Sequence, residues 1–124
     1  MGKASPDVIL DAALDEIATS TRLTVLTDEP ANFAGIAALL LASVVVTAGD
    51  GNGDFTVANG DTNGRKVTVA QQASISISSS GDADHIGLDD GTALQYVTTA
   101  TLQALVSGGT VTVPAWDVEI ADPT

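Results

Sequence analysis

The chain has 124 residues, and its 16 acidic residues outnumber four lysines and arginines, giving a formal net charge of −12 at pH 7. This length predicts a single domain, 1–124, with one hydrophobic core. So negative a surface argues against direct binding to nucleic acid or to an anionic membrane. The sequence contains no cysteine, which excludes disulfides, thiolate catalysis and cysteine-ligated zinc. Because only two phenylalanines, one tyrosine and one tryptophan are present, the core must be built mainly from aliphatic side chains.

An amphipathic helix is predicted at residues 6–19. Ser5, Pro6 and Asp7 form a typical helix start, with a capping hydroxyl, a proline at the first helical position and a carboxylate that complements the helix dipole. Apolar residues then recur on one face, namely Ile9, Leu10, Ala13, Leu14 and Ile17. An acidic row beside them, expected to face solvent, consists of Asp7, Asp11 and Asp15. We expect the helix to cover one face of a sheet or to dock on a partner.

Residues 22–122 are predicted to form a β domain. The expected strands are 22–27, 43–47, 55–58, 66–70, 73–79, 83–89, 93–99 and 110–121, with 102–106 leading to a turn. The strongest turn signals are Asp90-Gly91 and Gly108-Gly109, each predicted to close a hairpin. Pro114 predicts a bulge or an edge position, because proline cannot donate to a β-ladder. The predicted fold class is mainly β: an antiparallel β-sandwich or flattened barrel of about seven or eight strands with one N-terminal α-helix.

The packing pattern also predicts contacts between copies of the chain. The uncharged run at 33–48 is shorter than the ~20 residues of a membrane-spanning helix, so it is expected to be a buried segment that ends in the strand at 43–47. In the strand at 73–79, Ala73, Ile75 and Ile77 are expected to point inward. Few aromatic residues and this apolar run predict a homo-oligomer, with the helix or the 31–47 segment at the contact. The candidate interface residues are Ile9, Leu14, Ile17, Phe33 and Trp116. The alternatives are that 31–47 fills the monomer's own core and that Trp116 is a core anchor.

One loop has the composition of a cation site. Oxygen-bearing side chains alternate with glycine in Asp50-Gly51-Asn52-Gly53-Asp54, a pattern typical of calcium loops, and Asp61 stands at the twelfth position. The candidate metal ligands are Asp50, Asn52, Asp54 and Asp61. Phe55 stands where a helix-loop-helix calcium site has glycine, and the expected flanks are strands. A solvated turn is therefore the favoured alternative, and no other cofactor is predicted.

The single histidine, His85, is close in sequence to the serines at 78–80 and to Asp82 and Asp84, which are residue types that a catalytic triad requires. Because the neighbouring pattern is that of a strand and a turn, a surface or interface imidazole is favoured and no enzymatic role is predicted. The carboxylate pairs at 82/84 and 89/90 fit tight turns better than acid–base chemistry.

Several motifs together indicate a family. The segments NGDTNGRKVTV from Asn59, HIGLDDGT from His85, YVTT from Tyr96 and PAWDVEIADP from Pro114 resemble small virion-associated proteins encoded by tailed bacteriophages of proteobacteria. The N-terminal helix, the following strand and Glu29-Pro30 also resemble that group. The similarity covers nearly the full length and is most specific in the C-terminal third.

The resemblance implies a structural protein of the virion, made in the host cytoplasm, without catalytic residues. The leading expectation is a capsid decoration (cement) protein that binds the major capsid protein or another virion protein, with a trimer as the expected assembly. A tail, neck or fibre component is the alternative within phage biology. A small calcium-binding β module is the alternative of another class.

Overall fold

The computed structural model describes residues 6–121, and these residues form nine strands in antiparallel sheets together with an N-terminal helix. The elements in chain order are α1 (Asp7–Ile17), β1 (Arg22–Leu26), the 3-10 turn η1 (Phe33–Gly35), α2 (Ile36–Leu39), β2 (Leu40–Val45), β3 (Phe55–Asn59), β4 (Arg65–Val69), β5 (Gln72–Ser76), β6 (Gly81–Asp89), β7 (Leu94–Leu105), β8 (Thr110–Val113) and β9 (Trp116–Ile120). This confirms the predicted mainly β, sandwich-like fold class. The strand number exceeds the expected one because the predicted strand at 110–121 divides in two.

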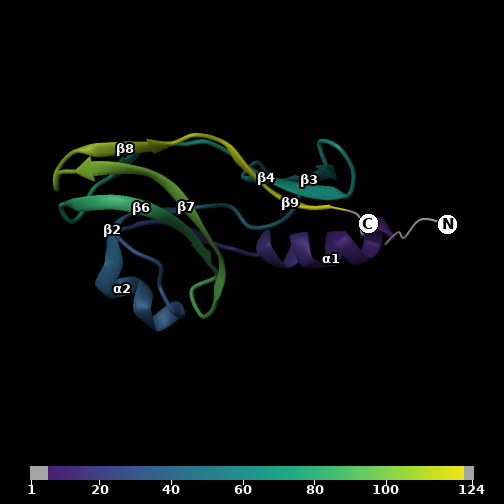
Figure 1. Cartoon of the computed structure of the whole chain (residues 1–124), viewed down its shortest axis with the longest axis horizontal. Helices are drawn as coiled ribbons and strands as arrows, with labels where there is room; N and C mark the ends of the chain where they lie inside the picture. The colour runs from purple at the N-terminus through teal and green to yellow at the C-terminus, as the bar shows by residue number, and fades with distance from the viewer. Residues whose placement is uncertain (1–5, 122–124) are drawn as a thin grey trace.

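The strands form three sheets, ordered β2-β1-β6-β7, β3-β4-β9 and β5-β8. The four-stranded sheet continues toward the β5–β8 pair through a bridge between Ala42 and Ile77. Figure 1 shows that these two sheets and α2 form a broad body, whereas β3, β4, β9 and α1 form a narrower end. The first and last described elements therefore lie at the same end of an elongated molecule.

One hydrophobic core runs through both parts of the molecule. Its fully buried members include Leu14 of α1, Leu23 of β1, Phe55 of β3 and Leu88 of β6. Aliphatic residues make up nearly all of this cluster, as the composition predicts. Leu26 and Ile36 are buried outside it, on the side where α2 lies against the body (Figure 1).

The N-terminal helix and the first hairpin agree with the sequence. The helix α1 begins at Asp7 with Pro6 as its N-cap, one residue later than expected, while the predicted Ser5 cap lies outside the described residues. The turn at Asp90-Gly91 joins β6 and β7 in an antiparallel pair, which confirms that hairpin. The Asp90 carboxylate accepts hydrogen bonds from the backbone N–H groups of Thr92 (2.9 Å) and Ala93 (2.7 Å), so the turn covers residues 90–93.

The prediction of a hairpin at Gly108-Gly109 is wrong. The chain turns there, but β7 pairs with β6 whereas β8 pairs with β5. Gly108 donates to the carbonyl of Ile77, and Ile77 donates to the carbonyl of Gly109 (both 3.0 Å). The turn thus docks on the β5 segment and passes the chain from one sheet to another, which a local turn signal does not reveal.

At Pro114, where a bulge or an edge position was expected, the strand is interrupted and the chain changes sheets. Residues on either side pair with different sheets, because β8 lies beside β5 and β9 lies beside β4.

In the strand at 73–79, Ile75 and Ile77 are buried as expected, but Ala73 is exposed. The register shifts between Gln72 and Ile75, and Ser74 adopts a positive φ of 55°, so the inward phase begins only at Ile75.

Candidate interaction surface

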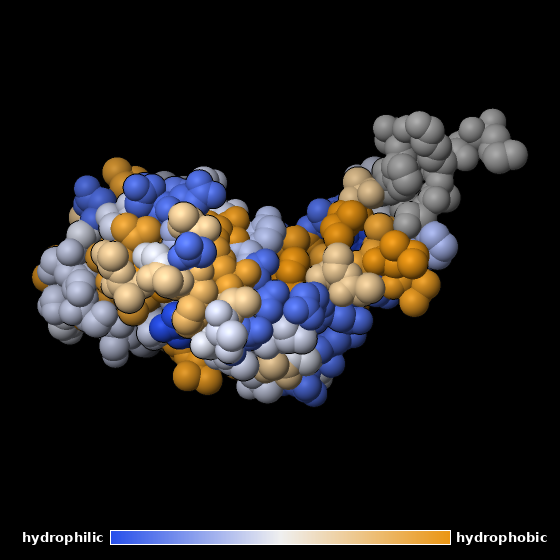
Figure 2. Space-filling model, turned by 90° about the horizontal axis from the view of Figure 1, so that it is seen from below, coloured by the Kyte–Doolittle hydropathy of each residue, from blue (hydrophilic) through white to orange (hydrophobic). Residues whose placement is uncertain are grey.

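The helix α1 carries more apolar surface than it buries. Leu10 and Leu14 point into the molecule, whereas Val8 and Ile9 are 71% and 60% exposed. We define the α1 outer face as the exposed residues Val8, Ile9, Ala12 and Ala13, which helical geometry places on one side. Figure 2 views the molecule from this side and shows apolar side chains gathered over the narrow end. The apolar sector of the helix therefore continues from the core to the surface.

The candidate interface residues differ in their exposure to solvent. Leu14 is fully buried, so its assignment to an intermolecular contact is wrong: it anchors α1 in the chain's own core. Ile17 is half-buried against that core. Phe33 is also half-buried, with the Arg22 guanidinium 6.0 Å from its ring centroid. Ile9 alone among the three residues proposed on the helix is strongly exposed.

Trp116 combines core packing with a surface position. Its ring stacks on Tyr96 with centroids 6.0 Å apart, and the residue packs at the margin of the core while half-buried. Its indole Nε1 is buried and has no hydrogen-bond partner in the described part of the chain. Trp116 thus packs against the core and is also partly accessible at the surface, so the structure is compatible with both alternatives, a core anchor and a surface contact.

Two hollows lie between β7 and the returning chain. The first has a volume of about 250 Å³ and lies between residues 100–105 and 111–114, with Val25, Ala83, His85 and Ile86 also lining it. The second, about 270 Å³, lies between Thr98, Thr99 and residues 113–117. Ile86, Val113 and Pro114 line both hollows, so the two are adjacent. We call the space between 98–105 and 111–117 the β7–β8 seam.

The loop proposed to bind calcium is closed by its own hydrogen bonds. Asp50 Oδ1 accepts from the N–H of Val57 at 2.8 Å, and Asp54 accepts from the N–H of Thr47 at 2.6 Å. Asn52 donates its side-chain amide to the carbonyl of Ala48, and Asp61 pairs with Lys66 at 2.7 Å. Within residues 6–121 these carboxylates form no group suited to hold a metal ion. In the structure, the side chains of Asp50, Asn52 and Asp54 form hydrogen bonds within the loop and to its flanking residues, as in a turn stabilised by aspartate and asparagine.

The structure does not bring the suggested triad together. His85 Nδ1 lies 2.7 Å from Asp84 Oδ1, and the imidazole lines the first hollow. The hydroxyl of Ser78 donates to the carbonyl of Leu41, whereas Ser80 Oγ accepts from the N–H of Ser107. His85 is thus half-buried at the seam, beside a carboxylate but away from an activated hydroxyl.

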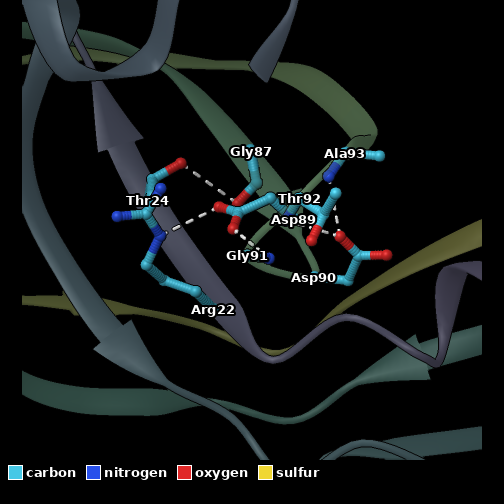
Figure 3. Close-up of polar contacts among 8 residues, drawn as sticks. All are labelled: Arg22, Thr24, Gly87, Asp89, Asp90, Gly91, Thr92 and Ala93. Atoms are coloured by element: carbon cyan, nitrogen blue, oxygen red, sulfur yellow. Dashed lines mark hydrogen bonds and ion pairs between the residues drawn. The ribbon is translucent and has the colours of Figure 1, made fainter. Parts of the chain in front are cut away.

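Asp89 and Asp90 have separate roles. Asp89 was expected in a tight turn but is the last residue of β6 and is completely buried. It accepts from Arg22 Nε at 2.9 Å and from the N–H of Gly91 at 3.0 Å. Figure 3 shows the Asp89 carboxylate directed at Arg22 and the Asp90 carboxylate directed at the turn. The two groups therefore do not face a common site.

The described cations are all paired. Arg22 pairs with Asp89, Arg65 with Asp11, and Lys66 with Asp61 and Asp117. The hydrogen bond to Asp11 raises the pKa of Arg65, and the hydrogen bond to Asp61 raises the pKa of Lys66. The Arg65–Asp11 pair also joins β4 to α1, so one member of the predicted solvated acidic row holds the helix. The remaining surface is dominated by unneutralised carboxylates.

Comparison with protein-family models, with curated protein sequences and with solved structures finds no match to this chain. In the part of the chain that is described, no helix is both long and apolar enough to cross a membrane.

Three features of the surface could take part in an interaction: the α1 outer face, the Tyr96–Trp116 stack and the β7–β8 seam. Sequence reasoning missed Val8 and the seam, although the uncharged stretch over 94–106 was a visible signal for an exposed apolar strand.

Proposed function

We propose that this protein is a structural component of a bacteriophage particle, and more concretely a capsid decoration protein that binds the major capsid protein. The observation that carries the proposal is the α1 outer face, where Val8 and Ile9 are 71% and 60% exposed. Contiguous exposed apolar side chains, flanked by acidic residues, are typical of a protein–protein contact. A decoration protein acts through such a contact alone.

The placement of the motifs that resemble phage proteins supports this proposal. The segment beginning at His85 lies in β6, the segment beginning at Tyr96 in β7 and the segment beginning at Pro114 in β9. Although distant in the sequence, they meet around the second hollow, where Ile86, Thr98 and Trp116 are neighbours in the lining. Three of the four segments that carry the resemblance therefore share one region of the structure.

The energetics of docking follow from the geometry. Burying an aliphatic side chain contributes about 1.5–3 kcal/mol, and Val8 and Ile9 project from the same helical face. The Arg65–Asp11 pair and buried Leu14 hold that face rigidly on the body, which reduces the entropy lost on binding. The acidic remainder of the surface would point to solvent and keep decorated particles apart.

The first test is the copy number of the chain in purified particles of the phage that encodes it. We expect on the order of hundreds of copies per particle, in fixed ratio to the major capsid protein, as symmetric decoration requires. About six to a few dozen copies would instead indicate a neck, tail or fibre component. Absence of the chain from purified particles would overturn the virion role altogether.

The second test addresses the contact. Purified protein should rebind to particles that lack it, and Val8→Lys should weaken rebinding by about tenfold or more, since a charge replaces buried apolar surface. Val45→Lys is the matched control, because Val45 is 81% exposed on β2 in the broad body. Equal rebinding of the two variants would contradict docking through α1.

A further inference from the structure

The β7–β8 seam presents two unpaired strand edges that face one another. β7 pairs with β6 on one side only, and β8 pairs with β5 on one side only. Although a short turn joins them, the Cα atoms of β7 and β8 lie more than 8 Å apart along nearly all of their length. Adjacent strands in a sheet lie about 4.8 Å apart, so β7 and β8 are not paired, and a separation of about two such spacings is what one additional strand requires.

The edge of β7 lacks the features that usually protect a free edge. Exposed edge strands are usually short, or carry lysine, other charges or proline. The 12 residues of β7, LQYVTTATLQAL, are long for an edge and include no charge or proline. The TVTV segment of β8 is also uncharged, but it is only 4 residues long and Pro114 follows it. The edge strand β9, by contrast, carries Asp117 and Glu119. A shift in register between Ala83 and His85 loosens the pairing of β7 at residues 100–102, and two of these residues line the first hollow.

The hollows between the edges fit alternating side chains. The lining of the first hollow is mostly aliphatic, with His85 and Gln103 among its polar members, whereas half of the second lining consists of two threonines, Trp116 and Asp117. Each hollow, at about 250 and 270 Å³, lies below the ~300–1,000 Å³ range of sites for drug-sized molecules. Two small hollows in line, between two unpaired backbones, are the arrangement by which sheets bind an extended peptide.

We infer that the seam binds an extended segment of a partner protein, which inserts as a strand between β7 and β8. Main-chain hydrogen bonds to both edges would hold the segment, and alternate apolar side chains would fill the two hollows. The inference concerns a surface distinct from the α1 outer face and does not depend on the virion role. An inserted strand is antiparallel to one edge and parallel to the other, because the turn between them reverses the chain.

Electrostatics identify the partner as a basic segment rather than a second copy. Asp117 lines the second hollow and shares Lys66 with Asp61, and Asp84 lies 2.7 Å from His85 Nδ1 at the first hollow, so the preference for a basic guest rests on the net charge of −12. Since Arg22, Arg65 and Lys66 are already paired, the described surface offers no free cation to an acidic guest. A second copy would bring a further charge of −12, which opposes association. The guest should therefore alternate apolar residues with lysine or arginine.

Hydrogen exchange on the full chain tests the inference directly. The probe is a panel of synthetic peptides about ten residues long, alternating valine, isoleucine or leucine with lysine, and long enough to span the seam. In the free chain the outward amides of 98–105 and 111–113 should exchange fast. Saturating peptide should slow them by about tenfold or more, and a matched panel with glutamate in place of lysine should bind about tenfold more weakly.

Two variants locate the effect. Thr101→Trp fills the first hollow and should reduce peptide affinity by about tenfold, whereas Leu102→Trp, at an exposed neighbour that lines neither hollow, should not. The inference is overturned if no lysine peptide slows exchange at the seam, or if protection appears elsewhere only. It is equally overturned if the seam amides are protected in the chain alone as its concentration rises, because a second copy would then be the occupant.

Discussion

At the scale of single residues, the least replaceable polar group is the Asp89 carboxylate. It is wholly buried, and its two oxygens accept from Arg22 and from the backbone of Gly91 (Figure 3). Arg22 and Asp89 stand directly opposite in the β1–β6 ladder, so the pair also marks the register of that ladder. A slip by one residue would bury a carboxylate without its partner.

Asp89→Ala should therefore lower the free energy of unfolding by about 3 kcal/mol, near the lower end for breaking a buried pair, because Arg22 keeps partial access to water. Asp82→Ala is the control on the same strand, at an exposed position, and should change stability by no more than about 0.5 kcal/mol. Urea denaturation of both variants measures the difference. Equal stabilities would show that the buried carboxylate contributes nothing specific.

Asp90 predicts a dependence on pH. Hydrogen bonds from the backbone N–H groups of Ala93 and Thr92 lower the pKa of Asp90. Because its pKa is lower in the folded chain than in the unfolded chain, the ionised group stabilises the fold above its ordinary pKa of about 3.9. This contribution is lost as the pH falls through the lowered folded-state value.

Asp90→Asn should accordingly be less stable than the parent chain at neutral pH, and the difference should shrink as the pH falls below about 3.9. Thermal unfolding of both proteins between neutral and strongly acidic pH measures this convergence. A difference that stays constant over the whole range would contradict the role of the ionised carboxylate. Asp82→Asn, exposed and outside the turn, controls for general loss of negative charge.

At the scale of elements, α1 is held by two buried leucines, Leu10 and Leu14, and by the Arg65–Asp11 ion pair. Leu14 is completely buried, whereas Ile9 is 60% exposed on the same helix. Leu14→Ala should lower the free energy of unfolding by about 3 kcal/mol, since it leaves a cavity in the core. Ile9→Ala should be nearly neutral for folding, within about 0.5 kcal/mol, while removing apolar surface from the α1 outer face.

The two alanine variants thus separate folding from docking. Chemical denaturation should detect only the Leu14 variant, and rebinding to particles should detect the Ile9 variant while its fold remains intact. If Ile9→Ala were as destabilising as Leu14→Ala, the exposed face of α1 would be part of the chain's own packing. The docking proposal would then lose its basis.

Elements whose signals are local were predictable from the sequence. The period of the apolar residues identified α1, and the Asp90-Gly91 turn identified the β6–β7 hairpin. Pro114 marked the point where the last strand changes sheets. Each of these depends on neighbours within a few residues, where propensity and turn chemistry act.

Features that depend on distant pairing were not predictable. The turn at Gly108-Gly109 resembles a hairpin, yet its geometry is fixed by Ile77, about thirty residues earlier, so the β7–β8 seam could not be foreseen. Leu14 and Ile9 share the same helical period, and the positions of the strands packed against α1, chiefly β4, decide which of them is buried. The loop at 50–61 has calcium-like spacing, but its carboxylates are used by backbone groups of β3 and of residue 47.

At the scale of the whole molecule, charge and apolar surface oppose each other. The net charge of −12 repels other copies, whereas the α1 outer face favours association. Salt acts differently on these two effects. Charge repulsion is screened over about 8 Å at physiological ionic strength, whereas the burial of apolar surface is not weakened. The predicted homo-oligomer, with a trimer as the expected form, should therefore depend on ionic strength.

We expect the isolated chain to be mainly monomeric at low salt and to associate through α1 as salt is raised, because screening removes the repulsion while the apolar contact persists. Sedimentation equilibrium across a range of protein and salt concentrations measures the assembly state. Val8→Lys should abolish association at every salt concentration, whereas Val45→Lys, with the same change of charge at the exposed position on β2, should leave it intact. A chain that stays monomeric at high salt and high concentration would contradict self-association through α1, and would leave that face available to the shell protein alone.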